Sequence, residues 1–288
     1  MYFNKNLDFF DILSYNVNMT KNKSNHYEDF YFDRARNIKG NKSSSHFHDR
    51  LEIYYMKEGG CNYFIEDKSF TVRSGDLVLI PSGVIHKTNY DSPLHERWLI
   101  NCFENYIPTS LKDSLSSMPR YFKRSKITED CEKIMLKIAE EYSRGDEYSV
   151  DAIKGYVSLI LFTLFRNLEK QESVATSGKL VESAVKFINH NYGAEVSLSQ
   201  TAESLGVSPE HLSRTFKKQT GFGFSEYLTL IRLQKAKNML SNEPGKTVGE
   251  VAFTCGFNDS NYFSYKFTKA YGVSPRSIKK LKKVVKNR

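Results

Sequence analysis

The alternation of hydrophobic and polar positions divides the chain into a strand-rich first part and a helical remainder. Between about residues 26 and 105, short apolar or alternating runs recur at close to ten-residue spacing, separated by glycine, serine and charged residues. This rhythm is typical of an antiparallel sandwich or barrel. The runs that we predict to be strands are residues 52–56, 61–65, 69–72, 76–80 and 97–103.

From about residue 127 the apolar period becomes that of an α-helix. Residues 127–142 and 149–170 each place apolar side chains three and four positions apart. The second of these segments is apolar around much of its circumference, so it needs cover from the barrel, from the neighbouring helix or from a second subunit. The polar stretch 171–178 has no periodicity and is therefore predicted to be an interdomain linker.

Beyond residue 178 the chain is predicted to be helical, and two segments about fifty residues apart echo each other. Each segment opens with a capping box, formed by Ser197 with Gln200 and by Thr247 with Glu250. In such a box the hydroxyl accepts from the third amide of the helix, while the longer side chain reaches back to the cap. Matched caps at this distance indicate an internal repeat.

Each copy of the repeat continues with a small residue and then a glycine. Ala202 and Ala252 allow a second helix to cross closely, and Gly206 and Gly256 supply the positive φ that a tight reversal requires. A second helix with an apolar pair four residues apart follows in both copies. In the first copy the predicted cap is Ser208, followed by Pro209, and the buried pair is Leu212 with Phe216. In the second copy the predicted cap is Asn258 or Asp259, and the buried pair is Phe263 with Phe267.

The order helix, glycine turn, helix occurs twice, and it predicts two helix-turn-helix units. The charge distribution agrees with a nucleic-acid partner for this part of the chain. Residues 179–288 hold 18 Lys and Arg against 8 Asp and Glu, whereas the first 178 residues hold 24 against 25. The excess positive charge of the protein therefore lies in its last 110 residues, which points to a polyanionic partner for that region only.

Residues 180 to 281 resemble the DNA-binding domain of AraC/XylS-type bacterial transcription regulators. The resemblance covers the first unit, the joining helix 224–240 with Tyr227, Arg232 and Ala236, and the segment 256–275. It implies that two recognition helices enter successive major grooves on one face of the DNA. That expectation agrees with a rigid joining helix, predicted here to be capped at Ser225, since one turn of DNA is roughly 34 Å.

The residues expected to face DNA lie opposite the buried pairs of the two recognition helices, and they coincide with the family's base-contacting positions. Arg214 can donate two parallel bonds to a guanine edge, and Asn261 can pair in the same bidentate way with adenine. Lysines nearby are expected to meet phosphates. The predicted base-facing set is Glu210, Ser213, Arg214, Lys217, Ser260, Asn261, Ser264 and Tyr265, and the predicted phosphate set is Lys217, Lys218, Lys266 and Lys269.

The first part of the chain carries a second resemblance, to the cupin barrel. The spacing Gly-x5-His-x-His-x3-Glu-x6-Gly runs from Gly40 to Gly59, and Gly-x5-Pro-x-Gly-x2-His follows from position 75 to 86. In cupins these histidines and the carboxylate converge inside the barrel. The resemblance therefore predicts an effector pocket, or a site for Fe, Mn, Ni or Zn, formed by His46, His48, Glu52 and His86.

Three interpretations of this pocket compete. The barrel is a non-catalytic sensor of a small molecule, often a sugar in such regulators; or a divalent metal helps it bind that effector; or it is a working oxygenase or isomerase fused to a DNA-binding domain. The DNA-binding region favours the sensor, because turnover of the effector would destroy the signal. A regulator whose barrel only dimerises is a further alternative. We therefore expect no enzyme activity and no required cofactor.

These observations predict an α+β multidomain protein. Its expected parts are a cupin-like antiparallel β-barrel (1–115), a helical dimerisation region (116–172), a linker (173–179) and an all-α domain with two helix-turn-helix units (180–288). The expected partners are double-stranded promoter DNA, a small-molecule effector, a second copy of the chain and, for an activator, RNA polymerase. Four scattered cysteines, and the lack of any apolar run of about 18 residues, predict a cytoplasmic protein without membrane contact.

Overall fold

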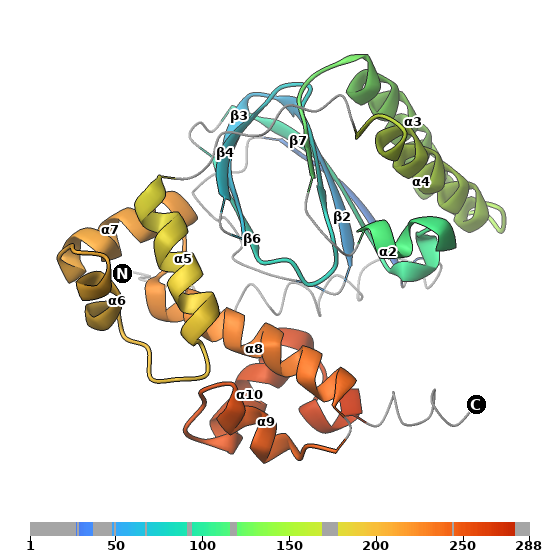
Figure 1. Cartoon of the computed structure of the whole chain (residues 1–288). Helices are drawn as coiled ribbons and strands as arrows, with labels where there is room; N and C mark the ends of the chain where they lie inside the picture. The colour runs from blue at the N-terminus through green and yellow to red at the C-terminus, as the bar shows by residue number, and fades with distance from the viewer. Residues whose placement is uncertain are drawn as a thin grey trace, which may run out of the picture. The chain divides into compact units, whose positions relative to one another are not determined.

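The computed structural model divides the chain into two compact units, shown in Figure 1. One unit is formed by residues 22–65 and 69–176, and the other contains residues 177–288. The described residues are 27, 29–36, 48, 50–66, 68–90, 94–115, 120–168, 178–243 and 245–279. His46 and most of the predicted linker 173–179 therefore lie outside the described residues.

The first unit is built on two antiparallel sheets, which face each other in Figure 1. The five-stranded sheet has the order β1-β7-β2-β5-β8, and the three-stranded sheet has the order β4-β3-β6. The five predicted strands are confirmed to within two residues at each end. The strands are β1 (Phe30–Arg36), β2 (Leu51–Glu58), β3 (Gly60–Ile65), β4 (Lys68–Arg73), β5 (Leu77–Ile80), β6 (His86–Asn89), β7 (Glu96–Cys102) and β8 (Arg120–Phe122).

Strand β2 shows how the five-stranded sheet divides two cores. Ile53 and Tyr55 point to one side, where they join the core beneath the helices of this unit. Tyr54 and Met56 point to the other side and join the core between the two sheets. Because side chains alternate along a strand, both faces of β2 are apolar and buried. The face toward the second sheet also carries the polar residues described below.

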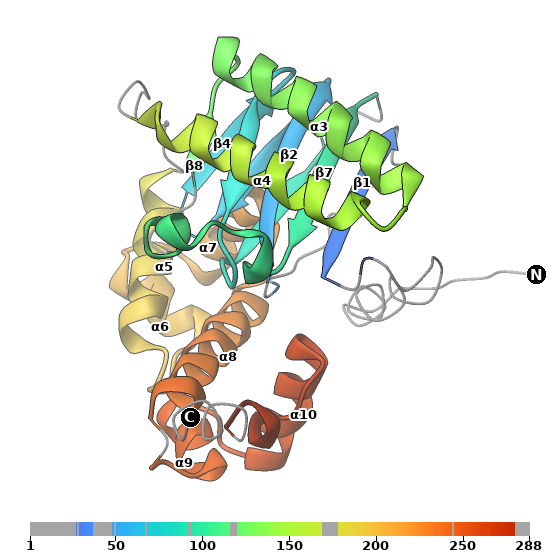
Figure 2. The ribbon, with the colours of Figure 1, turned by 90° about the vertical axis from the view of Figure 1, so that its right-hand side faces the viewer.

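Two long helices, α3 (Lys126–Arg144) and α4 (Ser149–Phe165), lie across the outer face of the five-stranded sheet (Figure 2). Both were predicted, although α4 ends at Phe165 and not near residue 170. A short 3-10 turn (Glu104–Tyr106), a second one (Thr109–Leu111) and the single-turn helix α2 (Lys112–Leu115) precede them. Buried side chains of α3 and α4 complete the core on this side of the sheet.

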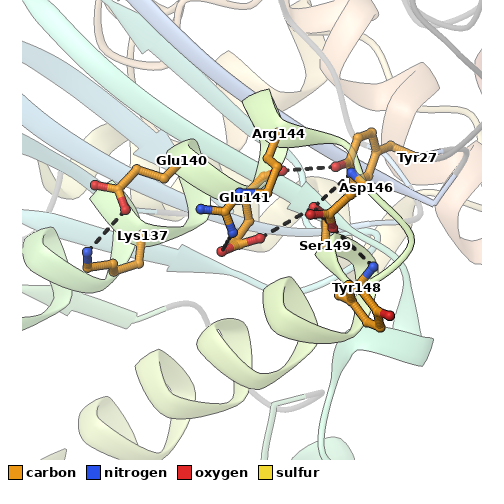
Figure 3. A network of polar contacts seen from close by, with 8 residues as sticks. All are labelled: Tyr27, Lys137, Glu140, Glu141, Arg144, Asp146, Tyr148 and Ser149. Carbon is orange, nitrogen blue, oxygen red and sulfur yellow. Dashed lines mark hydrogen bonds and ion pairs between the residues drawn. The ribbon is translucent and has the colours of Figure 1, made fainter.

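The turn between α3 and α4 is fixed by polar contacts (Figure 3). Helix α3 ends at Gly145, whose φ of 64° is left-handed and places its N–H on the carbonyl of Glu141. The Ser149 hydroxyl donates to Asp146 Oδ1 at 2.9 Å, and the Asp146 N–H donates back to the hydroxyl at 3.2 Å. Tyr27, from the segment before β1, donates to the Glu141 carbonyl at 3.1 Å. These contacts hold α4 beside α3 in an antiparallel hairpin.

Residues 178–243 and 245–279 of the second unit form helices joined by short turns, and they contain the repeat expected from the sequence. Both capping boxes form, with Ser197 accepting from the Gln200 amide and Thr247 accepting from the Glu250 amide, each at 3.1 Å. The helices are α5 (Lys179–Asn191), α6 (Leu198–Ser204), α7 (Pro209–Thr220), α8 (Phe224–Asn242), α9 (Val248–Thr254) and α10 (Ser260–Tyr271).

The joining helix α8 runs from the α6–α7 pair to the α9–α10 pair (Figure 1). Its predicted cap was wrong: the N-cap is Gly223, whose N–H donates to Glu226 Oε2 at 3.1 Å, and Ser225 lies in the first turn. Aromatic packing holds α8 to the first pair, since Phe216 of α7 meets both Phe224 and Tyr227 edge-on. No helix within the described ranges is long and apolar enough to cross a membrane.

Candidate functional site

The glycine turns of the two helix-turn-helix units have the same geometry. Gly206 and Gly256 have φ of 68° and 81°. The N–H of the residue after each glycine donates to the carbonyl of the alanine four positions before that glycine. Val207 N–H donates to the Ala202 carbonyl, and Phe257 N–H donates to the Ala252 carbonyl, both at 3.0 Å. Each unit therefore reverses the chain in the same way between its first and second helices.

Helices α7 and α10 begin and pack as predicted for recognition helices. Ser208 caps α7 by accepting from the His211 amide, with Pro209 at the first helical position. Asp259, and not Asn258, caps α10 by accepting from the Tyr262 amide. The predicted buried pairs are fully enclosed: Leu212, Phe216, Phe263 and Phe267 each have 0 % exposure.

The residues predicted to face DNA lie on the opposite, accessible sides of these helices. On α7 all five candidates, Glu210, Ser213, Arg214, Lys217 and Lys218, are exposed. On α10 the exposed candidates are Asn261 and Tyr265, whereas Ser260, Ser264, Lys266 and Lys269 are half-buried. Helices α7 and α10 thus each present a polar face with solvent-exposed residues.

Helix α10 carries an aromatic pair that sequence reasoning noted only in part. Tyr262 and Tyr265 are 51 % and 56 % exposed, which is unusual for such large side chains. Lys266 lies over the Tyr262 ring, 5.3 Å from its centre, and Lys269 donates to the Tyr265 hydroxyl at 3.2 Å. The lysines are therefore held beside the rings at the surface, where Tyr262 is an additional candidate contact residue.

Arg232 of α8 ties the two helix-turn-helix units together. Its Nε donates to the carbonyl of Tyr192 at 2.8 Å, and its Nη2 donates to the carbonyl of Ala194 at 2.9 Å. Both carbonyls belong to the turn between α5 and α6, at the entrance to the first unit. A Cβ on Gly256, in the turn of the second unit, would lie 2.5 Å from the Tyr192 oxygen and 2.8 Å from Arg232 Nη2. The three segments are therefore in direct contact.

A second cluster lies between the two sheets of the first unit, around the carboxylate of Glu52. The Nε2 atoms of His48 and His86 lie 3.0 and 3.6 Å from Glu52 Oε2. The Tyr63 hydroxyl donates to the other oxygen, Oε1, at 2.8 Å. Glu52 and His86 are 3 % and 2 % exposed. The structure thus brings together three of the four predicted pocket residues, and His46 lies outside the described part of the chain.

Burial and neighbouring charges shift the pKa of Glu52, His86 and Tyr63 in this cluster. Burial would raise the pKa of Glu52, but the nearby imidazoles of His86 and His48 outweigh it and hold that pKa well below its usual range. Burial would lower the pKa of His86, but Glu52 outweighs it and raises that pKa. Burial, followed by the charge of Glu52, raises the pKa of Tyr63 well above normal. Glu52 is therefore ionised at neutral pH, and Tyr63 remains a neutral donor.

The orientation of the two rings decides what can lie between them and Glu52. Nδ1 of His48 is 3.0 Å from the Arg50 carbonyl, and Nδ1 of His86 is 2.8 Å from the Val84 carbonyl. Each Nδ1 must therefore be the protonated donor, and each Nε2 points at a carboxylate oxygen. An unprotonated Nε2 would point its lone pair at a lone pair of the carboxylate oxygen. The site therefore requires either a second proton on the imidazole or a divalent cation.

The three donors fit a divalent metal. One ligand atom from each of His48, Glu52 and His86 lies within 4.8 Å of the other two. Two imidazoles and a carboxylate are a common ligand set for Zn and Fe. The Nδ1–H bonds to backbone carbonyls also match the outer contacts that orient metal-binding histidines. A protonated imidazole that donates from Nε2 to the Glu52 carboxylate would satisfy the same nitrogen and oxygen atoms without a metal.

Two further polar residues on β7 face the space between the sheets and were missed from the sequence. Arg97 binds Asp33 through Nη2 at 3.0 Å, while its buried Nη1 has no hydrogen-bond partner among the described residues. Asn101, 9 % exposed, lies directly opposite Glu52 in the β2–β7 ladder, and its Oδ1 is also buried without a described partner. Their only sequence signal was a polar residue at alternate positions of an otherwise apolar strand.

The fold and these two sites define a class of protein, a transcription regulator with a ligand-binding domain ahead of a helix-turn-helix domain. Comparison with known families agrees. The model of the AraC-like ligand binding domain matches residues 29–118, and that of a helix-turn-helix domain matches residues 201–280. The chain therefore belongs to the AraC family of transcriptional regulators.

Individual relatives are distant. The chain is 25 % identical over 245 residues to the HTH-type transcriptional activator RhaS of Escherichia coli strain SE11, covering 81 % of this chain and 86 % of that protein. Among solved structures, the C-terminal domain of AraT from Geobacillus stearothermophilus is 33 % identical, covers 37 % of this chain and 88 % of that one, and has a TM-score of 0.36. ToxT of Vibrio cholerae O395 is 15 % identical, with coverages of 87 % and 96 % and a TM-score of 0.37.

Proposed function

We propose that this regulator binds promoter DNA sequence-specifically through α7 and α10 in response to a small molecule held between its two sheets. One observation carries the proposal: two helix-turn-helix units of matched geometry each present an accessible polar face, and helix α8 with its residue Arg232 joins them. A rigid pair of recognition helices suits two successive major grooves of one DNA duplex.

In this proposal Arg214 and Asn261 read bases and the lysines hold the backbone. Arg214 donates two parallel bonds to a guanine, and Asn261 pairs with an adenine through its amide. Lys217, Lys218 and, beside the tyrosines of α10, Lys266 and Lys269 neutralise phosphates and set the position of the protein. Glu210, Ser213, Ser260, Ser264 and Tyr265 complete the base-facing surface.

The effector that suits the interior of the first unit is a neutral, polyhydroxylated molecule such as a sugar. The carboxylate of Glu52 is balanced by the imidazoles, and Arg97 is balanced by Asp33. Among the buried atoms that have no hydrogen-bond partner in the described residues are one donor, Arg97 Nη1, and one acceptor, Asn101 Oδ1. Hydroxyl groups can serve both, since each hydroxyl donates and accepts. A charged effector would leave an uncompensated charge in a buried site.

A metal is not required by this proposal. If one is present, His48, Glu52 and His86 hold it, and it supplies a Lewis-acidic point of attachment for an effector oxygen. The alternative of an enzyme fused to a DNA-binding domain is tested by the metal content of the purified protein. Substoichiometric metal, together with an intact effector response in the chelated protein, excludes a metalloenzyme.

The effector is proposed to act by changing how two DNA-binding units align on paired half-sites. The helical region 116–172 forms the contact between two copies of the chain, and ligand between the sheets biases its arrangement. The chain's similarity to a transcriptional activator supports activation, with RNA polymerase as a further partner.

The test has one arm for DNA and one for the effector. Selection of bound sequences from a random DNA pool with the full chain is expected to yield two short motifs about one helical turn apart. Arg214→Ala is expected to lose one position of the first motif, while Lys137→Ala, on α3, serves as a matched loss of charge away from the DNA-binding unit. Recovery of no motif would refute sequence-specific binding.

For the effector, thermal unfolding is measured with a panel of neutral sugars and, as controls, of sugar acids. A ligand that binds the native state raises the melting temperature by mass action. Asn101→Ala is expected to remove the shift. The protein could bind its DNA motif equally with and without every ligand and show no thermal shift. That result would favour the alternative in which the first unit only dimerises.

A further inference from the structure

Helix α10 exposes two large aromatic rings on the side that is expected to face DNA. Tyr262 and Tyr265 are each more than half exposed, and Asn261 beside them is also exposed. On α7, in contrast, Phe216 is fully buried and the exposed side chains are charged or polar. The two recognition helices therefore resemble each other in their buried faces and differ in the chemistry of their exposed faces.

The caps place the two recognition helices in a common register. Counted from Ser208 in α7 and from Asp259 in α10, the buried pair of each helix falls at the fourth and eighth positions. The sixth position is Arg214 in α7 and Tyr265 in α10, and both side chains are exposed. A phenol in α10 therefore stands where α7 carries the guanidinium that is proposed to read a guanine.

The side chain of Tyr265 is held by a lysine of its own helix. Lys269, one turn further on, has its ammonium 5.4 Å from the ring centre and donates to the hydroxyl at 3.2 Å. A single hydroxyl cannot form the two parallel bonds with which an arginine pairs with guanine. The largest surface that Tyr265 can offer to a base is therefore its apolar ring.

An apolar ring suits one base edge of the major groove better than the others. Thymine carries a C5-methyl group there, whereas adenine, guanine and cytosine present hydrogen-bond donors and acceptors. Asn261 lies four positions before Tyr265, so the two side chains share one row of the helix. An asparagine in such a row pairs with adenine. Both residues of this row therefore favour A·T base pairs.

We propose that Tyr265 is a specificity-determining residue that reads the methyl group of a thymine in the DNA motif bound by α10. The proposal rests on the proposed function, in which α7 and α10 enter the major groove, and names the bases that the second helix selects. Asn261 contacts an adenine at a neighbouring base pair, and Lys269 extends past the ring to a phosphate. The two motifs therefore differ, with a guanine in the first and A·T pairs in the second, so the protein binds its site in one orientation.

Removing one methyl group from the DNA tests this contact. Each thymine of the second motif is replaced in turn by uracil, which keeps the base pair and lacks only the methyl group. Binding of the full chain is measured by fluorescence anisotropy. One replacement is expected to weaken binding about fourfold, the effect of leaving one methyl group out of an apolar contact.

Three variants connect that effect to Tyr265. Tyr265→Ala removes the ring and is expected to bind the thymine and uracil forms equally. Tyr265→Phe keeps the ring and is expected to retain the fourfold difference. Tyr148→Ala removes an exposed tyrosine just before α4 and is the matched control, with the wild-type difference expected. Thermal unfolding of each variant confirms that the fold is intact.

An exchange of the sixth residue tests the register of the two helices. Tyr265→Arg gives α10 the residue that α7 carries at that position. Selection of bound sequences from a random pool with this variant is expected to replace the thymine of the second motif by a guanine, with the first motif unchanged.

Several outcomes overturn the proposal. A wild-type chain that binds every uracil form as tightly as the thymine form has no contact with a methyl group. A difference that persists in Tyr265→Ala, or that is lost in Tyr265→Phe, assigns the effect to another residue or to the hydroxyl. A Tyr265→Arg variant that still selects thymine does the same. Recovery of no motif by the wild type refutes the proposed function, whereas recovery of both motifs without a uracil effect refutes only this role of Tyr265.

Discussion

Arg232 and Tyr192, forty positions apart, are joined by a hydrogen bond of 2.8 Å from the guanidinium Nε to the backbone carbonyl. The second bond, from Nη2 to Ala194, completes a clamp that closes the turn before the first helix-turn-helix unit. Burial lowers the pKa of Arg232, but the group remains a cation at any physiological pH. The clamp is therefore a charge-assisted pair of bonds that fixes the first unit to the joining helix.

Replacing Arg232 is expected to weaken binding to DNA that carries both motifs more than binding to DNA that carries one motif. Arg232→Ala removes two bonds to backbone carbonyls, which is expected to lower the free energy of unfolding by about 1–3 kcal/mol. Arg232→Lys keeps the charge but can no longer reach both carbonyls in the planar fork. Both variants are measured by fluorescence anisotropy on duplexes with one or two motifs. An equal loss on both duplexes would show that Arg232 stabilises the fold without setting the spacing.

The two turn glycines allow a matched comparison. Gly206→Ala places a Cβ in open space, so only the left-handed φ opposes it, at about 1–2 kcal/mol. Gly256→Ala carries the same penalty and also puts a Cβ 2.5 Å from the Tyr192 oxygen, which is expected to cost roughly 1–3 kcal/mol more. Urea unfolding measures both. Equal losses for the two variants would mean that the 192–194 turn moves away freely.

The sequence predicted what local patterns determine and missed what distant segments create. The capping boxes, the glycine turns and the buried apolar pairs are short-range signals, and all were found where expected. Strand β6 was missed because His86–Asn89 is polar at every position, and it forms only by pairing with β3. The clamp of Arg232 and the interior position of Asn101 depend on residues 38 or more positions away, which no local pattern reports.

Arg214 and Lys217 are expected to differ in the kind of affinity that they provide. Arg214→Ala removes bidentate recognition of one base, so binding to the selected motif is expected to weaken by about 1–3 kcal/mol, with specificity relaxed at that position. Lys217→Ala is expected to weaken binding to all sequences about equally and to reduce the salt slope by about one unit. Binding isotherms from low to moderate salt separate the two. A Lys217 variant with an unchanged salt slope would remove it from the phosphate contacts.

The cluster of Glu52, His86 and His48 is expected to give the first unit a stability maximum between acidic and alkaline pH. The pKa of Glu52 is lowered by folding, so its contribution is present at neutral pH and is lost as the carboxylate is protonated on the acidic side. The pKa of His86 is raised by folding, so its contribution is complete below the ordinary histidine range, about pH 6.5, and is lost as pH rises above it.

Glu52→Gln tests that coupling, because it keeps the shape of the side chain and removes the charge that raises the pKa of His86. Thermal unfolding of the wild type and the variant is followed from pH 5 to pH 9 with a chelator present, so that only protons can occupy the site. The wild type is expected to lose stability from about pH 6.5 upward, and the variant is expected to lose much less over that interval. Tyr55→Phe, which removes the hydroxyl that donates to Glu132 at 2.6 Å on the other face of β2, is the control and should keep the wild-type profile. Parallel profiles for the wild type and the Glu52 variant would mean that Glu52 does not raise the pKa of His86 in the folded protein.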